Sequence, residues 1–248
     1  MPEETVITVE NVDAGYEDVP VLRDVTFSVR RGEVFAILGG SGCGKSTLLK
    51  HMIGLNPPLK GEIRLMGDRI FGGAQEESAR ALRHFGVTYQ SGALFGSMTL
   101  LENVCLPLES FTDLPPEARN LVAEMKLELV GLKEYADYFP SDISGGMKKR
   151  AAIARAMALD PALLFLDEPS AGLDPVTSAG LDRLILRMRD TQGVTVVMVT
   201  HELPSIFAVA DRCVMLDKQT KSLIAEGPPA DLRDHCDNET VRGFFNRE

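Results

Sequence analysis

The sequence has few cysteines and no long apolar run. Four cysteines occur in 248 residues, and none stands close enough to another for a zinc site or a disulfide framework. We expect free thiols in a reducing cytosol and no metal cage built from cysteine. Apolar runs such as 194–199 stop short of the roughly 18 to 20 residues that span a bilayer, so we expect any membrane role to come through a partner.

Positive charge is also scarce. Lysine and arginine number 26 against 36 acidic residues, which gives a net charge of −10. General binding to nucleic acid depends on an excess of lysine and arginine, so no nucleic-acid partner is expected. Residues 1–10 are acidic and lack an apolar centre, so we expect no secretory signal. The 44% of hydrophobic residues is enough for a sizeable buried core.

The pattern of apolar residues predicts an α/β fold. Short β-rich segments dominate the first third of the chain, and the strand-like run 33–38 leads directly into a glycine-rich turn. From 162 onward, apolar strand-like runs alternate with helical segments such as 176–190. We therefore predict a mainly parallel α/β core within one domain over 5–248, with a helical insert at about 95–160.

The helical insert is predicted mainly from residues 114–132. This segment has prolines at its start and Gly131 at its end, as helices often do. Its apolar residues occur at helical spacing, namely Ala118, Leu121, Val122, Met125 and Leu129.

The glycine-rich turn at 39–47 has the spacing G-x-x-x-x-G-K-S/T between a predicted strand and a predicted helix. Its backbone N–H groups can surround phosphate oxygens of ATP, Lys45 can reach the β- and γ-phosphates, and the Ser46 hydroxyl can hold Mg²⁺. The alternative is an ordinary glycine turn. The residues predicted to bind nucleotide here are Gly39, Gly40, Ser41, Gly42, Cys43, Gly44, Lys45, Ser46 and Thr47. We also expect thiol reagents at Cys43 to block this site.

Two acidic residues end the apolar run that starts at 162. Asp167 is predicted to join the Mg²⁺ shell, and Glu168 to orient the water that attacks ATP. The alternative is a helix cap and a surface acid. Upstream, Tyr16 can stack on an adenine ring, although a partly buried tyrosine is an equally simple interpretation. Together with the glycine-rich turn, these residues predict ATP hydrolysis.

A second helix start in residues 142–157 also favours anion binding, because Ser144 and two glycines precede strong helix formers. This segment resembles the signature sequence of ATP-binding cassette (ABC) ATPases, with Ile143 and Met147 where the common form has Leu and Gln. The other motifs occur in the order of that family, ending in residues 170–174 and His201.

The resemblance implies a fold and an assembly. The fold is a P-loop NTPase cassette with a RecA-like, mainly parallel sheet, an N-terminal antiparallel β subdomain and a helical signature subdomain. Two copies pair head to tail, so that Ser144, Gly145 and Gly146 of one copy contact the γ-phosphate held by the other. Asp174 lies at the seam between the two sites.

By the same resemblance, His201 contacts the γ-phosphate and Gln90 joins the Mg²⁺ and water shell. The predicted catalytic residues are therefore Lys45, Gln90, Glu168 and His201, and the predicted metal ligands are Ser46, Gln90 and Asp167. The other histidines, His51, His84 and His235, are expected to be caps or surface residues. The basic run 148–150 is expected to form the exposed first turns of the signature helix, and direct phosphate contact is its alternative.

The loop after Gln90 is expected to meet a membrane subunit. Its apolar residues Leu94, Phe95 and Met98 suit a docking groove for a short permease helix, with packing inside the domain as the alternative. At the chain end, packing of Phe244 and Phe245 on their own domain is favoured over contact with the other cassette or a regulator.

The sequences of residues 90–95, of residues 102–108 and of the Met-containing signature resemble those of the cassette subunit of Mla and Mce-type phospholipid transport systems. That resemblance implies two copies beneath integral membrane permease subunits, on the cytoplasmic face of the bacterial inner membrane. An MCE-domain lipid-binding protein lies across the membrane, and a STAS-domain regulator accompanies some such systems. The alternatives are an importer of amino acids or other small solutes and, less favoured, a soluble cassette that remodels nucleic acid or a protein complex.

Overall fold

The structure is a computed structural model that describes residues 4–246. Its first sheet is antiparallel, with the order β2-β1-β4-β5. Its strands are β1 (Thr5–Tyr16), β2 (Val19–Arg30), β4 (Lys60–Leu65) and β5 (Asp68–Arg69). Buried side chains face one another across it, since Ile7 pairs with Leu65 and Val9 with Ile63. The predicted N-terminal antiparallel β subdomain is confirmed.

The second sheet has the order β10-β9-β3-β8-β7-β6, and only β10 runs antiparallel to its neighbour. Its strands are β3 (Val34–Leu38), β6 (Phe85–Thr88), β7 (Leu163–Asp167), β8 (Thr195–Val199), β9 (Arg212–Asp217) and β10 (Ser222–Gly227). Strands covered on both faces need apolar side chains at nearly every position, which explains the continuous apolar runs in the sequence. The predicted mainly parallel core is confirmed.

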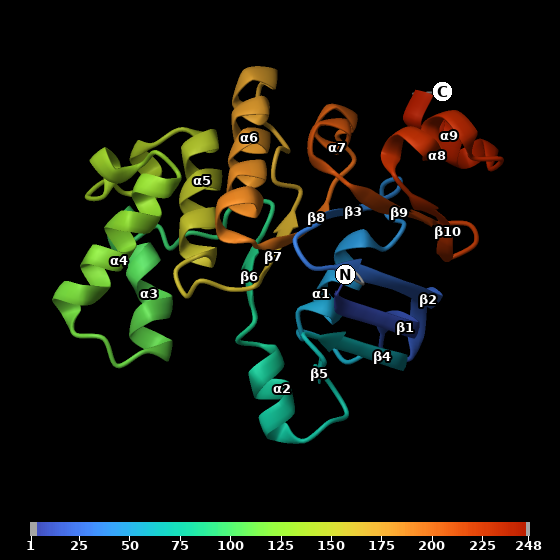
Figure 1. The fold of residues 1–248 in the computed structure, drawn as a ribbon, viewed down its shortest axis with the longest axis horizontal. Helices are drawn as coiled ribbons and strands as arrows, with labels where there is room; N and C mark the ends of the chain where they lie inside the picture. Colours follow the sequence, from blue (N-terminus) through green and yellow to red (C-terminus); the bar gives the residue numbers. More distant parts are fainter. Residues whose placement is uncertain (1–3, 247–248) are drawn as a thin grey trace.

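The second sheet separates two hydrophobic cores, and β3 contributes alternate residues to each. Phe35 and Ile37 pack toward helix α1 (Lys45–Met52) and the first sheet. Ala36 and Leu38 pack on the opposite face, where the remaining large helices lie. Figure 1 shows α1 between the two sheets and α6 (Pro175–Gln192) and α7 (Leu203–Val209) on the other side. The nucleotide-facing end of β3 is therefore held from both faces.

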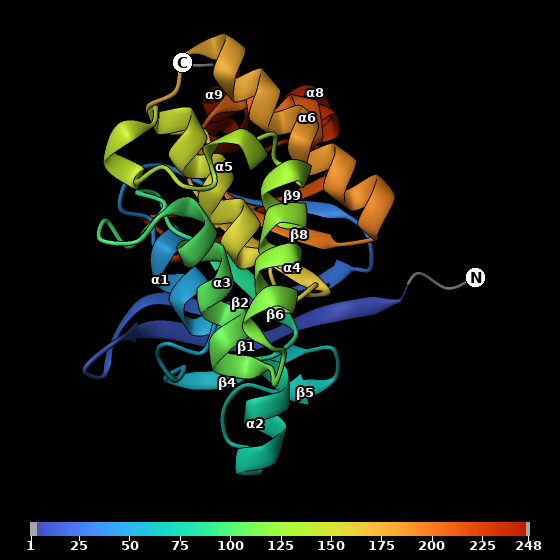
Figure 2. The same cartoon turned by 90° about the vertical axis from the view of Figure 1, so that its left-hand side faces the viewer.

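Three helices gather at one end of the molecule, as Figures 1 and 2 show. They are α3 (Leu100–Phe111), α4 (Pro116–Leu129) and α5 (Gly145–Ala156), and the 3-10 turns Lys133–Tyr135 and Pro140–Asp142 lie between α4 and α5. A capping box between Thr99 and Glu102 fixes the start of α3.

The predicted helix at 114–132 forms as α4, but two residues of its apolar set are exposed and the other three are only partly buried. Leu121 and Met125 are 62% and 66% exposed. The buried face runs through Ala123 and Leu127 because α4 packs there against α3 and α5. Lys126 is also on this face, and it forms an ion pair with Asp160.

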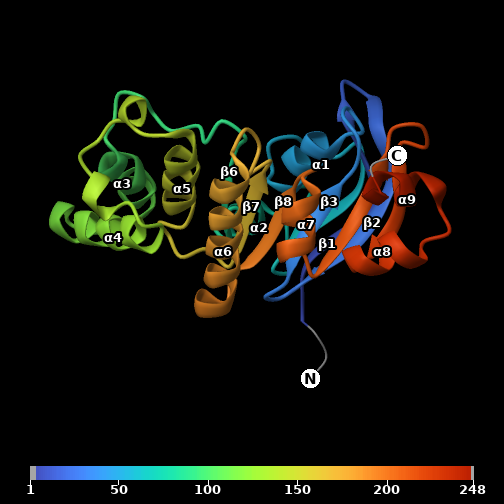
Figure 3. The same cartoon turned by 90° about the horizontal axis from the view of Figure 1, so that it is seen from above.

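The other helices are α2 (Gln75–Ala81), α8 (Pro229–His235) and α9 (Glu239–Asn246). Figure 3 shows α8 and α9 at the end of the molecule opposite α3–α5. Phe245 is 4% exposed and packs against Phe207, so packing on its own domain is confirmed for this residue. None of the helices within residues 4–246 has the length and apolar content needed to cross a membrane.

Candidate nucleotide site

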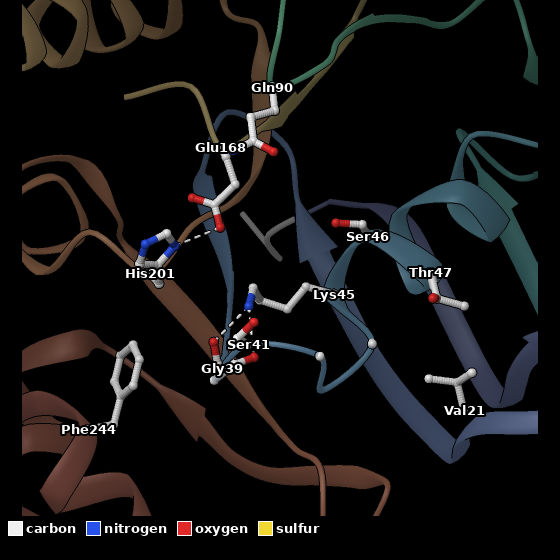
Figure 4. A pocket seen from close by; sticks show the side chains of 13 residues that line it. Val21, Gly39, Ser41, Lys45, Ser46, Thr47, Gln90, Glu168, His201 and Phe244 are labelled. Atoms are coloured by element: carbon white, nitrogen blue, oxygen red, sulfur yellow. Dashed lines mark hydrogen bonds and ion pairs between the residues drawn. The ribbon is translucent and has the colours of Figure 1, made fainter. Parts of the chain in front are cut away.

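A cavity of about 630 Å³ opens where β3 ends and α1 begins. Lys45, Gln90, Glu168 and His201 all line it, although 156 positions separate the first and last of these residues in the sequence. Figure 4 shows the side chains of Glu168, His201 and Lys45 gathered around the same space. The full wall consists of Val21, Gly39, Gly40, Ser41, Gly42, Gly44, Lys45, Ser46, Thr47, Gln90, Glu168, His201 and Phe244.

The glycine-rich loop requires glycine at two positions for steric reasons. Gly39 has φ +146°, and a Cβ there would lie 2.5 Å from both Cys43 Sγ and the Leu216 carbonyl oxygen. Gly44 has φ +105°, and a Cβ there would lie 2.9 Å from the Leu22 side chain. Only glycine adopts such φ values freely. The backbone of the resulting tight turn lines the cavity. Helix α1 begins directly after the turn, so its N-terminus faces the same space, as anion binding requires.

The ammonium group of Lys45 lies over this loop. Its Nζ donates to the carbonyl oxygens of Gly39 at 2.7 Å and Gly40 at 3.1 Å, and the residue as a whole is buried. A charge held at the mouth of a helix N-terminus adds to the attraction of that end for anions. The arrangement can therefore bind the phosphate groups of a nucleotide.

Glu168 and His201 form a bonded pair on the far wall. Glu168 directly follows β7 and is 9% exposed, and its Oε1 lies 2.8 Å from His201 Nδ1. Its other oxygen, Oε2, is buried and has no hydrogen-bond partner within residues 4–246. Because Glu168 also lines the cavity, its carboxylate is able to accept a proton from a water molecule bound there.

Asp167 and Ser46 provide oxygen ligands of the kind that Mg²⁺ prefers. Asp167 Oδ1 is buried without a partner in the described part of the chain. Burial raises the pKa of Asp167, the nearby charge of Glu168 raises it further, and the Ser46 hydroxyl opposes both effects. Ser46 and Gln90 line the nucleotide cavity, whereas Asp167 lies beside Ser46 and is not part of the wall formed by residues 4–246. The donor set of Ser46, Gln90 and Asp167 therefore fits a hard divalent cation held beside a phosphate.

Two predicted nucleotide residues lie outside the cavity wall formed by residues 4–246. Tyr16 ends β1 with 43% of its surface exposed, and Lys50 Nζ lies 5.9 Å from its ring centre. Cys43 is 2% exposed and lines a separate cavity beneath the loop together with Met215 and Phe244. Burial raises the pKa of the Cys43 thiol.

The signature residues also lie away from this cavity. Ser144 caps α5, its Oγ accepting from the Met147 N–H at 3.3 Å. Gly145 is exposed, whereas a Cβ on Gly146 would lie 2.4 Å from the Thr177 side chain. Figure 1 shows β7 and β6 between α5 and α1. Within residues 4–246, the signature residues and the phosphate loop therefore do not line one cavity.

Asp174 caps the neighbouring helix α6. Its Oδ1 accepts from the N–H groups of Val176 at 3.0 Å and Thr177 at 3.1 Å. Hydrogen bonds from the Thr177 side chain and backbone lower the pKa of Asp174. Because Gly146 packs on Thr177, the starts of α5 and α6 are adjacent on the molecule.

His51 was expected to be a cap or surface residue, and that expectation is wrong. Its ring is completely buried, and Nε2 accepts from the Gly15 N–H at 3.1 Å. Nδ1 then carries the proton and donates to the Asn56 carbonyl oxygen at 2.8 Å. The ring therefore joins the C-terminal end of α1 to the strand that ends in Tyr16.

The basic run also differs from expectation. Lys149 is partly buried, and its Nζ donates to the backbone carbonyl of Glu168 at 2.9 Å. Sequence reasoning missed this contact, and it missed Val21 as part of the cavity wall. Phe244 also lines the cavity. The adjacent Phe244 and Phe245 are conspicuous in the sequence, but nothing in the sequence connects them with the nucleotide cavity.

Comparisons with known proteins agree with these motifs. The family model described as ABC transporter matches residues 22–171. The chain is 40% identical to the probable ribonucleotide transport ATP-binding protein mkl of Mycobacterium leprae, over 99% of this chain and 70% of that protein. It is 38% identical to the intermembrane phospholipid transport system ATP-binding protein MlaF of Escherichia coli, over 91% of this chain and 83% of that protein.

Solved structures resemble the whole fold. The cbiO1 protein of Clostridium perfringens, part of the ABC transporter complex cbiONQ, has a TM-score of 0.85 and 28% identity, covering 94% of this chain and 92% of that one. A dimeric ATP-binding cassette in a post-hydrolysis state, bound to ADP and Pi, has a TM-score of 0.79 and 30% identity. That match covers 90% of this chain and 98% of the cassette.

Proposed function

The chain belongs to the ABC transporter family as an ATP-hydrolysing cassette, and on that premise we propose that its ATP turnover moves phospholipid through a membrane permease. The observation that carries the catalytic part is the convergence of Lys45, Gln90, Glu168 and His201 on one cavity at the start of α1. Cargo is proposed from the resemblance to MlaF, which extends over 91% of the chain.

In the proposed mechanism, the loop N–H groups and Lys45 hold the β- and γ-phosphates. Glu168 orients a water molecule and accepts its proton, while His201 keeps the carboxylate in place through Oε1. Attack by this water breaks the bond between the γ-phosphorus and the bridging oxygen, and ADP leaves. Bound Mg²⁺, held by Ser46, Gln90 and Asp167, would neutralise charge on the phosphate oxygens.

Tyr16 is proposed to stack on the adenine of the bound nucleotide. It lies at the end of β1 with a half-exposed ring, next to the helix whose other end carries the phosphate loop. The exposed aromatic face is available to a planar ligand.

The second helix start is proposed to complete the site of a partner copy. Ser144 and Gly145 are exposed at the N-terminus of α5 and do not line the cavity of their own chain within residues 4–246. In a head-to-tail dimer, Ser144, Gly145 and Gly146 would donate to the γ-phosphate bound by the other copy. Asp174, at the adjacent start of α6, would lie at the seam between the two sites.

The loop after Gln90 is proposed to receive a short helix of the permease. Buried Asn103 holds the loop backbone: its Oδ1 accepts from the Phe95 N–H at 2.8 Å, and its Nδ2 donates to the Phe95 carbonyl at 3.1 Å. The Phe95 ring remains 50% exposed, while Leu94 and Met98 are partly buried. A rigid backbone that presents an apolar ring suits a protein contact.

The wider assembly follows from the proposed phospholipid function. Two copies would lie on the cytoplasmic face of a bacterial inner membrane, beneath permease subunits. An MCE-domain protein would carry lipid on the other side, and a STAS-domain protein would regulate the cassette. Nucleic acid is not among the proposed partners, because the net charge is −10.

A second candidate is an importer of a small solute. One specific observation favours it: the M. leprae relative, which is 40% identical, carries the description of a probable ribonucleotide transport protein. The cassette does not contact cargo in either case, so its own site does not discriminate between them. A soluble cassette outside transport is less favoured because both named relatives are transport proteins.

Affinity purification of the cassette from native membranes tests this proposal. Co-purified proteins and bound lipids are then identified by mass spectrometry. Recovery of a permease, an MCE-domain protein and enriched phospholipid supports the phospholipid function. Recovery of a permease with a solute-binding protein, and no lipid enrichment over an unrelated membrane complex purified in parallel, would replace it with the solute importer.

A further inference from the structure

The two adjacent lysines at the start of α5 have different environments. The Lys148 side chain makes no hydrogen bond or ion pair within residues 4–246. Lys149 instead turns inward, beside Tyr89, Pro169 and Leu181, and donates from Nζ to the Glu168 carbonyl oxygen at 2.9 Å. A buried ammonium is costly unless it is bonded, so this contact fixes where the side chain lies.

The backbone of Glu168 needs such support. Glu168 has φ +48°, in the left-handed region that residues other than glycine rarely adopt. Its N–H donates to the Val199 carbonyl at 2.8 Å, and its carbonyl accepts from both Lys149 Nζ and the Ala171 N–H. Unfavourable backbone conformations persist only where the surroundings hold them. Lys149 is the one side chain among these partners.

We propose that Lys149 is a positioning residue that holds Glu168 in the orientation needed to activate water. This inference rests on the proposed role of Glu168 in hydrolysis. Lys149 does not touch the nucleotide cavity formed by residues 4–246, so it acts through Glu168 alone. The helix that presents Ser144 to a partner copy thereby also supports the water-activating carboxylate of its own chain.

Arg155 makes a parallel contact from the other end of the same helix. Its guanidinium donates to the carbonyls of Ala93 at 2.8 Å and Gly92 at 3.2 Å, in the loop after Gln90. It also lies 5.8 Å from the centre of the Phe95 ring. Helix α5 is thus bonded both to the loop proposed to meet the permease and to Glu168. A shift of α5 at either end would alter the support of Glu168.

Two physical effects could connect Lys149 to Glu168, and they predict different mutant behaviour. The first is the directed hydrogen bond to the carbonyl. The second is the charge of the ammonium near the two carboxylates; burial lowers the pKa of Lys149, and attraction to Glu168 and Asp167 opposes that shift. The bond requires a donor at the position of Lys149 Nζ, whereas a non-directional effect of the basic run would also be weakened by removal of the neighbouring charge of Lys148.

The test compares three variants of the full chain in steady-state ATP hydrolysis. Lys149→Met keeps the length of the side chain but removes the donor, and we expect kcat to fall about tenfold, the loss typical of a hydrogen bond to a charged group. The KM for ATP should stay within about twofold, because the phosphate loop is untouched. Lys149→Arg should recover most of the lost kcat, and Lys148→Met should resemble the original chain.

A double variant strengthens the test. If Lys149 acts through Glu168, then Lys149→Met should cause no further loss of kcat in a Glu168→Gln background. A full additional tenfold loss would show that Lys149 acts elsewhere.

Several outcomes would overturn the inference. These are an unchanged kcat in Lys149→Met, an equal loss in Lys148→Met, or a rise in KM in place of the fall in kcat. If Lys149→Met does not fold, Lys149→Arg decides, because a folded Arg variant with a fully lost kcat contradicts a donor role. The proposed role of Glu168 is tested separately. Rapid hydrolysis by Glu168→Gln would contradict the role of Glu168. An inactive Glu168→Gln together with a fully active Lys149→Met would contradict only the role of Lys149.

Discussion

Helices α1 and α5 both begin with glycine-rich turns, yet their surroundings differ. The start of α1 opens into a cavity that also contains Gln90, Glu168 and His201. The start of α5 is exposed at Ser144 and Gly145 and lies beside the start of α6, and these two residues do not line that cavity within residues 4–246. Both N-termini attract anions through the same backbone groups. Only the first is placed beside groups that can activate water.

The contrast divides nucleotide chemistry into two parts. The α1 end carries the residues that we propose bind the phosphates and prepare a water molecule. The α5 end offers anion-binding groups but does not line the nucleotide cavity formed by residues 4–246, which is why we propose that it completes the site of a partner. Variants at the α1 end should therefore remove turnover itself, and variants at the α5 end should spare binding of ATP to a single chain.

The largest effect is expected at the α1 end, from Glu168→Gln. Loss of the water-activating carboxylate should lower kcat by about 10²- to 10⁴-fold. ATP binding should persist, and a closed dimer should accumulate because its nucleotide is not consumed. Phosphate release and light scattering in the presence of ATP measure these two results. Glu202→Gln, which changes an acidic residue 3.8 Å from His201, is the matched control. Rapid hydrolysis by Glu168→Gln would contradict the assignment.

At the α5 end, Ser144→Asp keeps a helix cap but places a negative charge toward the partner's phosphate. We expect hydrolysis to fall about tenfold or more, since a charge-assisted hydrogen bond is replaced by repulsion. Binding of ATP to the monomer should be unchanged when measured by fluorescence at low protein concentration. Ser144→Thr, which retains the hydroxyl and the cap, serves as the control. Loss of monomer binding in Ser144→Asp would place this residue in its own chain's site.

A third variant addresses how the two ends are connected to the membrane. Phe95→Asp should weaken binding to the permease by about 30-fold, the effect of losing an interface hot spot of about 2 kcal/mol. Stimulation of ATP hydrolysis by the permease should fall with it. Leu121→Asp alters an apolar residue on α4 that is at least as exposed and should not have this effect. Unchanged co-purification and stimulation in Phe95→Asp would remove the docking role.

The smallest expected effect concerns Cys43, beneath the phosphate loop. Because burial raises the pKa of its thiol, the reactive thiolate forms at a higher pH than in an ordinary cysteine. Alkylation of Cys43 by iodoacetamide should therefore keep accelerating to a higher pH than alkylation of an ordinary thiol. It should also be slower than at Cys236, which is partly exposed whereas Cys43 is buried. Bound ATP should slow it further by restraining the loop. Peptide mass spectrometry follows both sites, and a rate at Cys43 that ignores ATP would contradict this.

Much of the fold could be predicted because its strongest signals are local. Strands β3, β7 and β8 are apolar at nearly every position, and the phosphate loop has a fixed spacing between strand and helix. The buried face of α4 could not be predicted from its apolar residues. It includes a paired lysine and a small alanine, while larger apolar residues on the same helix face outward.

The missed parts of the candidate site depend on contacts between distant segments. Lys149 belongs to a basic run whose sequence predicts exposed side chains. It contacts Glu168 because α5 packs beside the residue that follows β7. His51 is buried because β1 brings the Gly15 N–H to its ring. Tyr16 stays a prediction, since its ring lies outside the cavity wall described by residues 4–246.

The hydrogen bonds between the Asn103 side chain and the Phe95 backbone have a consequence for hydrogen–deuterium exchange. The Phe95 amide donates to a completely buried side chain, so it should exchange slowly although it lies in an exposed loop. The next two amides, of Gly96 and Ser97, have no hydrogen bond within residues 4–246 and should exchange quickly. The loop thus contains a slow amide beside two fast ones, which lets an exchange experiment tell a bound partner from a local loss of structure. A partner that covers the loop slows Gly96 and Ser97, whereas an opening of the loop speeds Phe95.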